Sequence, residues 1–212
     1  MANHCWNWIS LTGETANMEL LENRLNKYKQ TKYFTEWGDY VLGIGAIGDT
    51  EEIFKKRHEH DPYYVYGTKW FEFEIDSKNI DDKSGQCDFR ITGDSAWSPP
   101  IPLIERICEK YNLTAEMEYE EGGMDFAGIL LIDASGIKSH DQMTCHEYRY
   151  KDNVDSWVDD LAYNYEGEED LNYTEVMEEL KRDHDYASEK DLLRVIMLIM
   201  EWNKKRDEIN KE

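Results

Sequence analysis

The stretch Trp97-Ser-Pro-Pro-Ile-Pro-Leu-Ile-Glu-Arg-Ile-Cys-Glu-Lys-Tyr-Asn-Leu113 decides the architecture more than any other part of the chain. Ser98 is a residue type that caps helices, and Pro99 suits the first helical position, because the N–H that it lacks would be unpaired there. The apolar side chains that follow recur on one helical face, at Ile101, Ile104, Ile107 and Cys108. Because strand-like apolar runs flank this helix, the stretch predicts a strand–helix–strand unit.

The start of the chain predicts a strand followed by a helix. Residues 3–12 alternate between two faces, as in a half-buried strand. One face holds Cys5, Ile9 and Leu11, and the other holds Trp6 and Trp8. From Thr15 to about residue 30 the apolar spacing becomes helical. The inner stripe of this helix is Met18, Leu21 and Leu25.

Further alternating segments predict the remaining strands of one sheet. They cover residues 69–76, 87–92, 114–121 and 126–133, with residues 144–150 as a further edge strand. We interpret residues 31–68 as an insertion after the first helix. Without it, the order of the first six elements is βαββαβ. This order predicts an α+β, ferredoxin-like antiparallel sheet with two helices packed on one face.

Helical spacing replaces strand alternation after Asn153. Three helices are expected: one from Val154, one over Val176–Arg182 capped by Thr174, and one over Glu189–Ile209 capped by Ser188. Between Leu192 and Trp202 the last helix has more apolar residues than one stripe needs, so it packs within the fold or forms a homo-oligomer. We therefore expect a sheet domain over residues 1–150 and an acidic helical module over residues 151–212.

Three short motifs carry a family resemblance. They are Asn-Trp-Ile-Ser-Leu-Thr-Gly at 7–13, Ala-Trp-Ser-Pro-Pro-Ile-Pro-Leu at 96–103, and Gly-Gly-Met-Asp-Phe-Ala-Gly at 122–128. Together they resemble the YubB-type ferredoxin-like domain family of phages and conjugative plasmids, over about residues 3–135. The resemblance implies the ferredoxin-like fold and a phage or mobile-element accessory protein that acts inside a bacterium. It carries no catalytic residues with it.

The net charge limits the classes of partner. The chain has 46 acidic and 24 basic residues, a formal net charge of −22, and such a field repels nucleic acid and anionic membranes while it attracts basic protein surfaces. The sequence has no apolar run long enough for a membrane span, and its start is unlike a signal peptide. We expect a protein of the bacterial cytoplasm whose cysteines, Cys5, Cys87, Cys108 and Cys145, are buried thiols.

An acidic run in the C-terminal module is the strongest functional signal. Residues 152–191 hold fifteen acidic and three basic residues, mixed with aromatic side chains. Acidic and aromatic residues on ordered helices can imitate a phosphate track and offer contact anchors. The expected partner-binding residues are Trp157, Asp159, Asp160, Tyr163, Tyr165, Glu166, Glu168, Glu169, Asp170, Tyr173, Glu175, Glu178 and Glu179.

This surface is expected to bind and inhibit a basic host protein, one that handles nucleic acid and serves in defence. The chain itself is expected to be no enzyme, to need no cofactor or metal, and to contact no nucleic acid or membrane directly. A solvated helical face that only keeps the chain soluble is the other interpretation of the same charge.

Several residue groups keep other functions open. Glu116, Glu118 and Glu120 share a strand face near Asp125 and Asp133, as an acid–base or divalent-ion site could require. Metal-ligating side chains also occur, without zinc-site spacing, at His4, Cys5, His140, Asp141, Cys145, His146 and Glu147.

Two further alternatives are binding of single-stranded nucleic acid and binding of a nucleotide. Trp6, Trp8, Trp70 and Tyr119 could stack single-stranded nucleic acid, although the basic groove that such proteins use is missing. Residues 43–48 match the glycine pattern of a nucleotide-binding turn, but Asp49, Glu51 and Glu52 follow at once and would repel phosphate. A loop is the favoured interpretation of this glycine motif.

Overall fold

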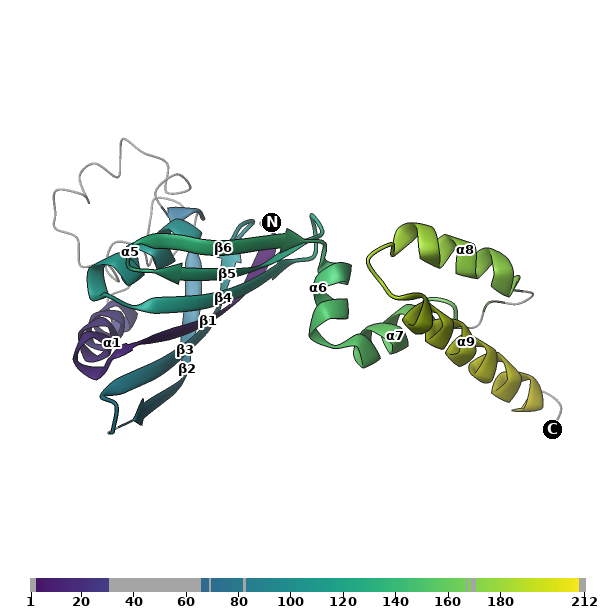
Figure 1. The fold of residues 1–212 in the computed structure, drawn as a ribbon, viewed down its shortest axis with the longest axis horizontal. Coiled ribbons are helices and arrows are strands. Elements are labelled where there is room, and N and C mark those ends of the chain that lie inside the picture. Colours follow the sequence, from purple (N-terminus) through teal and green to yellow (C-terminus); the bar gives the residue numbers. More distant parts are fainter. Residues whose placement is uncertain are drawn as a thin grey trace. The chain divides into compact units, whose positions relative to one another are not determined.

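The structure, a computed structural model, describes residues 3–30, 66–68, 70–81, 83–166, 168 and 171–209, without the side chains of 27–30 and 207–209. Most of the expected insertion at 31–68, including the glycine motif at 43–48, lies outside these residues. The chain divides into two compact units, a sheet unit over Met1–Gln142 and a helical unit over Met143–Glu212. Figure 1 labels the elements of both.

Six strands form the sheet of the first unit. They are β1 (His4–Glu14), β2 (Phe71–Asp81), β3 (Gln86–Ala96), β4 (Thr114–Glu121), β5 (Phe126–Asp133) and β6 (Gly136–Met143). Their order across the sheet is β2-β3-β1-β4-β5-β6, and every pair with a defined register is antiparallel. The first four strands with the two helices α1 (Thr15–Gln30) and α5 (Ile101–Tyr111) give the ferredoxin-like order, and β5 and β6 extend it. The expected α+β, ferredoxin-like fold is confirmed.

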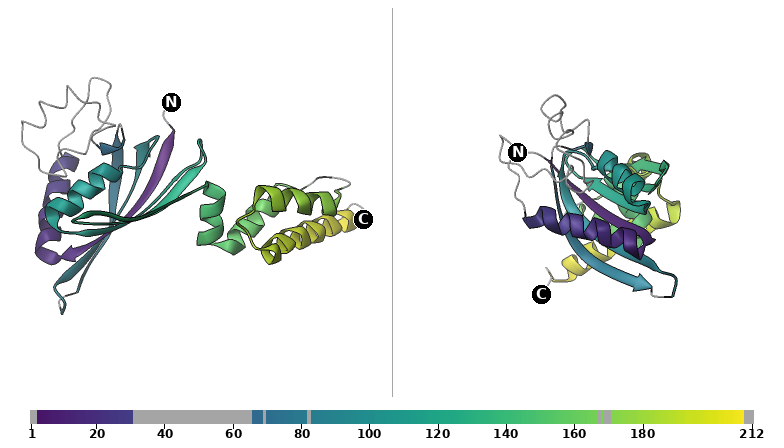
Figure 2. Two further views of the ribbon diagram at one scale, coloured as in Figure 1. Left: turned by 45° about the horizontal axis from the view of Figure 1, so that its top comes forward. Right: turned by 90° about the vertical axis from the view of Figure 1, so that its left-hand side faces the viewer.

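Helices α1 and α5 lie on the same face of this sheet (Figure 2). The apolar stripe expected on α1 is buried, with Met18 and Leu21 fully inaccessible, and it shares one core with the inward residues of the strands. From α5, Leu103, Ile104, Ile107 and Cys108 enter the same core. Apolar burial on a single face explains why the other face of the strands can remain polar.

The start of α5 differs from the expected cap. The helix begins at Ile101 after Pro100, and no side chain caps it. The Ser98 hydroxyl instead donates to the Gly67 carbonyl, and the Ser98 carbonyl accepts the Ser95 hydroxyl at 2.8 Å. Ser98 therefore fastens the loop after β3 to the segment before β2, and the prediction that it caps the helix is wrong.

Buried side chains that form hydrogen bonds lie in or next to the two other motifs, at 7–13 and 122–128. The Asn7 amide nitrogen, in a side chain 1% exposed, donates to the Cys5 carbonyl at 2.7 Å, the Ser95 hydroxyl at 2.9 Å and the Gly93 carbonyl at 3.2 Å. The Glu121 carboxylate accepts the amide N–H groups of Gly123 and Met124, which closes the turn between β4 and β5. Both motifs therefore stabilise chain geometry in the sheet unit.

Tyr119 joins β4 to β6 across β5. Its register partner is Gly128, where an added Cβ would come within 2.4 Å of the tyrosine oxygen, so the ring lies over a residue without a side chain. The Tyr119 hydroxyl reaches His140 Nε2 at 2.8 Å. Burial raises the pKa of Tyr119. A ring that is 1% exposed cannot stack on a nucleobase, so its place in the nucleic-acid alternative is wrong.

The helical unit holds α6 (Cys145–Asp152), α7 (Val154–Tyr163), α8 (Tyr173–Asp183) and α9 (Glu189–Ile209). Residues 145–152 are helical because Thr144 caps them, its hydroxyl accepting the Glu147 N–H at 3.1 Å. The edge strand expected over 144–150 is therefore wrong, and the helical unit begins before residue 151. None of the described helices is long and apolar enough to cross a membrane.

Candidate protein-docking surface

The apolar core of the helical unit decides which side chains remain outside. Buried residues from three helices form it: Trp157, Val158, Leu161 and Ala162 from α7, Val176 and Leu180 from α8, and Leu192, Val195, Ile196 and Ile199 from α9. Much of the apolar surplus expected between Leu192 and Trp202 is thus used inside the unit. Leu193, Met197 and Met200 remain about half exposed or more, at 48%, 68% and 49%, along one line of α9.

Side-chain caps set the ends of these helices. The Asn153 side chain accepts the Ser156 N–H at 3.1 Å before α7, and the Ser188 hydroxyl accepts the Asp191 N–H at 3.2 Å before α9, as expected for Ser188. Helix α8 begins one residue before the expected cap Thr174, because Asn172 accepts the Thr174 N–H at 3.2 Å. The cap expected at Thr174 is therefore wrong.

Helix α7 exposes acidic residues without any base of its own. Asp155, Asp159 and Asp160 are exposed, and the helix contains no lysine or arginine. Arg194 of α9 pairs with Asp155. Among the described residues, Asp159 and Asp160 make no ion pair. Their charge is therefore presented to solvent.

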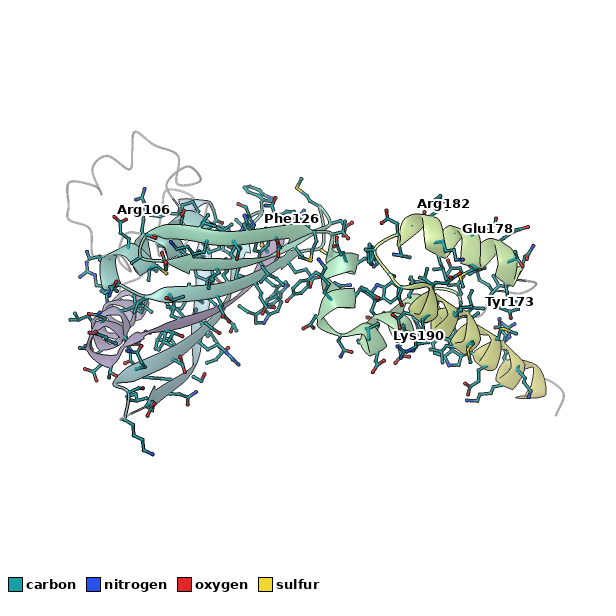
Figure 3. The ribbon with its side chains drawn as sticks, in the orientation of Figure 1. Arg106, Phe126, Tyr173, Glu178, Arg182 and Lys190 are labelled. Atoms are coloured by element: carbon teal, nitrogen blue, oxygen red, sulfur yellow. The ribbon has the colours of Figure 1, made fainter. Side chains whose placement is uncertain are left out.

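Helix α8 adds a second set of carboxylates. Glu175, Glu178 and Glu179 are exposed, and Figure 3 shows Glu178 and Arg182 on the outer side of the helix. The bases of α8 bind other acids, since Arg182 contacts Asp183 at 2.8 Å and Lys181 contacts Glu189. Within the described part of the chain, Glu178 and Glu179 therefore form no ion pair either.

Three acidic residues on or just before α8 act on Tyr165. The pKa of the Tyr165 hydroxyl is raised, first by burial and then by the negative charges of Glu179, Glu168 and Asp183. Carboxylates from the segment before α8 and from α8 itself therefore lie close enough to Tyr165 to raise its pKa. We name the exposed set Asp159, Asp160, Glu166, Glu168, Glu175, Glu178 and Glu179 the acidic helical surface.

The expected aromatic anchors divide into three groups. Trp157 is 2% exposed and belongs to the core, so the expectation that it contacts a partner is wrong for the folded unit. Tyr165 and Tyr173 are partly buried against that core. Tyr163 is 66% exposed and borders a hollow of about 350 Å³ that His146, Arg149 and Asp160 also line. Glu169 and Asp170 lie outside the described residues.

An aromatic cluster that the sequence did not indicate surrounds Trp157. The ring centroids of Trp157 lie 5.0 Å from Tyr150 and 5.5 Å from His184. The His184 ring also meets His146 at 5.7 Å, and its Nδ1 lies 2.8 Å from the Tyr186 hydroxyl. The pKa of His184 is lowered, first by burial and then by the charge of His146, with Asp183 opposing. These contacts join α6, α7 and the loop before α9.

The other candidate groups are spread over the fold. The described residues contain no cluster of three histidine, cysteine or acidic side chains placed to hold a metal ion. His4 pairs with Asp94 at 3.2 Å, and all four cysteines are buried thiols outside any disulfide, as expected. Glu116, Glu118 and Glu120 do share one face of β4, where they lie beside Ser10, Trp8 and Trp6 of β1.

Comparison with known proteins supports the assignment of a ferredoxin-like domain. Residues 72–176 match a family model described as a ferredoxin-like domain in Api92-like protein, a range that begins in β2 and ends in α8. A crystal structure of protein api92 from Yersinia pseudotuberculosis is 10% identical and aligns with 68% of this chain and 99% of its own, with a TM-score of 0.41. No curated protein matches the chain. The chain therefore carries a ferredoxin-like domain similar to the one in Api92-like proteins.

Proposed function

We propose that this chain is a non-enzymatic accessory protein of a phage or mobile element, related to the YubB-type domains, that acts in the bacterial cytoplasm. It binds and inhibits a basic host protein that handles nucleic acid, and its acidic helical surface competes with DNA for that protein. A defence nuclease or a modifying enzyme has the required chemistry, because each presents a basic face to phosphate.

One observation carries the proposal. Five of the seven acids of the acidic helical surface stand on the ordered helices α7 and α8, and the bases Lys181, Arg182 and Arg194 of α8 and α9 are paired with acids outside it. Fixed carboxylates on a rigid element attract a basic face over about 10 Å at moderate ionic strength and are already oriented when the partner arrives. Loosely held surface acids that only aid solubility do not need this arrangement.

Tyr163 supplies the apolar part of the contact. Its ring is 66% exposed at the end of α7, beside Asp160 and the hollow that both residues line. Tyrosine is enriched at the energetic centre of protein interfaces, where charge alone gives little net affinity. The partner is therefore expected to place a side chain against Tyr163 while its basic residues meet α7 and α8.

The test compares two variants of equal net charge. The first, Asp159→Asn/Asp160→Asn/Glu178→Gln/Glu179→Gln, neutralises the surface. The matched control, Glu14→Gln/Glu19→Gln/Glu105→Gln/Glu109→Gln, neutralises four acids of the sheet unit, one at the end of β1 and three on α1 and α5. Each immobilised protein is exposed to bacterial lysate over a salt series, and the retained proteins are identified by mass spectrometry.

The wild type and the control should retain the same basic protein at low salt, and the surface variant should lose it. Duplex DNA added as competitor should release this protein from the wild type, and the protein's own activity on DNA should fall when the wild-type chain is added. If the surface variant retains and inhibits the protein as well as the control does, the acidic helical surface is not the docking site.

A further inference from the structure

The face of the sheet opposite α1 and α5 presents two indole rings to solvent. Trp6 and Trp8 of β1 are 55% and 40% exposed, although the neighbouring Cys5 and Ile9 are completely buried on the other face. We name the strand face that carries Trp6 and Trp8 the open face. Large exposed aromatic side chains on an ordered strand face that neither α1 nor α5 covers are typical of an interaction site.

The spacing of the two indoles matches an extended chain. Trp6 and Trp8 are two positions apart on one strand, so their Cβ atoms are separated by about 6.7 Å. Alternate side chains of any extended polypeptide have the same separation. A segment that runs along β1 can therefore place every second side chain over an indole without leaving the extended conformation.

Each ring has a carboxylate at a neighbouring position. The antiparallel register sets Trp6 between Asp94 of β3, which His4 contacts at 3.2 Å, and Glu120 of β4, and it sets Trp8 between Thr92 of β3 and Glu118 of β4. Directly paired side chains on one face have Cβ atoms about 5 Å apart, so a cation above an indole also reaches a carboxylate. Glu72, Glu74 and Glu116 occupy further positions of the same face.

The face has little positive charge to oppose these acids. At the described positions of β1, β3 and β4 on the open face, Arg90 is the only lysine or arginine. Arg90 pairs in register with Ser10, the next open-face position after Trp8, in a hollow of about 300 Å³ lined also by Ser10, Asp88 and Glu116. The described positions around Trp6 and Trp8 hold more carboxylates than this one base, so they suit a cationic occupant.

We propose that the open face binds an extended protein segment with arginine or lysine at alternate positions, each cation stacking on Trp6 or Trp8 and pairing with a neighbouring carboxylate. Indole is the strongest of the protein cation–π partners, and a guanidinium that stacks keeps its N–H groups directed toward carboxylates at the ring edge. The site belongs to the sheet unit alone and does not depend on the acidic helical surface.

Single-stranded nucleic acid is the competing occupant of two exposed indoles. Bases stack on aromatic rings, but the proteins that use this mode line the groove with positive charge to hold the phosphates. The carboxylates beside Trp6 and Trp8 would repel those phosphates. Charge complementarity therefore favours the basic segment.

The experiment measures binding of short fluorescein-labelled peptides to the full chain by fluorescence anisotropy at low salt. One peptide alternates arginine with serine, a second has the same composition with its arginines adjacent, and a third replaces arginine with glutamate. A labelled oligothymidine is the nucleic-acid probe. The alternating arginine peptide should bind about tenfold more tightly than the adjacent form, and the glutamate peptide should not bind.

The decisive variant is Trp6→Leu/Trp8→Leu, which keeps an apolar surface and the net charge but removes both indoles. Trp97→Leu is the matched control, because Trp97 is 42% exposed but lies beyond the end of β3. Affinity for the alternating peptide should fall about tenfold in the double variant, as expected for two exposed cation–π contacts, and remain unchanged in the control. Circular dichroism confirms that both variants fold.

Three results would overturn the inference: no binding of the arginine peptides at low salt, equal binding by the double variant and the wild type, or tighter binding of oligothymidine than of the alternating peptide. Because Trp6→Leu/Trp8→Leu alters no charge and no residue of the helical unit, these results are separate from a failure of the acidic helical surface.

Discussion

Asn7 provides a sharp test of how the sheet unit is held together. Its amide nitrogen donates to three acceptors, the carbonyls of Cys5 and Gly93 and the hydroxyl of Ser95. The side chain is 1% exposed, so water cannot replace these bonds. Replacing Asn7 with alanine leaves buried acceptors without donors in the middle of the sheet.

The expected loss of stability follows from the number of buried acceptors that are left without a donor. Each buried polar group left unsatisfied costs about 1–3 kcal/mol. The Ser95 hydroxyl has one proton, which goes to the Ser98 carbonyl at 2.8 Å but can also reach the Cys5 carbonyl at 3.3 Å, so fewer than three acceptors lose every partner. We expect Asn7→Ala to lower the free energy of unfolding of the sheet unit by about 3 kcal/mol, a large share of the roughly 5–15 kcal/mol of an ordinary domain.

Asn7→Asp should be worse than the alanine variant, although it has the same shape. A carboxylate cannot donate, and it would place a buried negative charge against two carbonyl oxygens. The free energy of unfolding should therefore fall in the order wild type, Asn7→Ala, Asn7→Asp. If lost packing were the main effect, Asn7→Asp would be the more stable of the two variants, because aspartate has nearly the shape of asparagine.

The assay is equilibrium urea unfolding followed by circular dichroism, with hydrogen exchange of β1 and β3 amides to assign the transition to the sheet unit. Asn79→Ala is the control, because Asn79 is exposed on β2 and should change stability by less than about 0.5 kcal/mol. A cost below about 1 kcal/mol for Asn7→Ala, or wild-type stability of Asn7→Asp, would show that these hydrogen bonds do not stabilise the sheet unit.

Three further measurements address other parts of the fold. Burial raises the pKa of Cys108 to about 12, so iodoacetamide should label it at mildly alkaline pH only after unfolding, and equal labelling of native and urea-unfolded protein by mass spectrometry would contradict this. The pKa of His184 lies below its unfolded value of 6.5, so the unfolded chain takes up a proton first; stability of the helical unit should be constant above that pH and fall below it. Urea unfolding at about pH 7.5 and 5.5 checks this, and an equal loss in His184→Gln would assign the effect to another group. If the exposed line of Leu193, Met197 and Met200 joins two copies of the chain, Met197→Asp should give a monomer by light scattering where the wild type is a dimer, and a monomeric wild type would refute self-association.

Much of the sheet unit could be predicted from local pattern. Alternation placed Cys5 and Ile9 opposite Trp6 and Trp8, and burial follows that division. Because strand periodicity and an amphipathic face are properties of neighbouring residues, βαββαβ order and the ferredoxin-like fold followed from them. The same holds for α9, whose start at Glu189 and end at Ile209 agree with the expected bounds.

Errors occurred where a residue had two possible partners. Ser98 and Thr174 are residue types that cap helices, but the Ser98 hydroxyl donates to the Gly67 carbonyl, and Asn172 is the residue that caps α8. Residues 144–150 suit a strand by composition, yet the Thr144 hydroxyl was able to close a first helical turn. Local propensity gives a set of options in such cases, and hydrogen-bond geometry selects one.

The same difference between local sequence and tertiary packing applies to the acidic helical surface. The sequence determined which acids crowd residues 152–191, because charge is a property of composition. The helical spacing of Trp157, Val158 and Leu161 indicates an inner stripe that leaves Tyr163 out, and packing against α8 and α9 buries Trp157 while Tyr163 stays exposed.

Composition and periodicity by themselves determined the negative charge, the order of strands and helices, and the inward face of each. Only the tertiary structure decided which polar groups pair across distant segments, as Asn7 does with Ser95 and Tyr119 with His140. Such pairs depend on the register between strands, and register is fixed by the sheet as a whole, so no segment contains it alone.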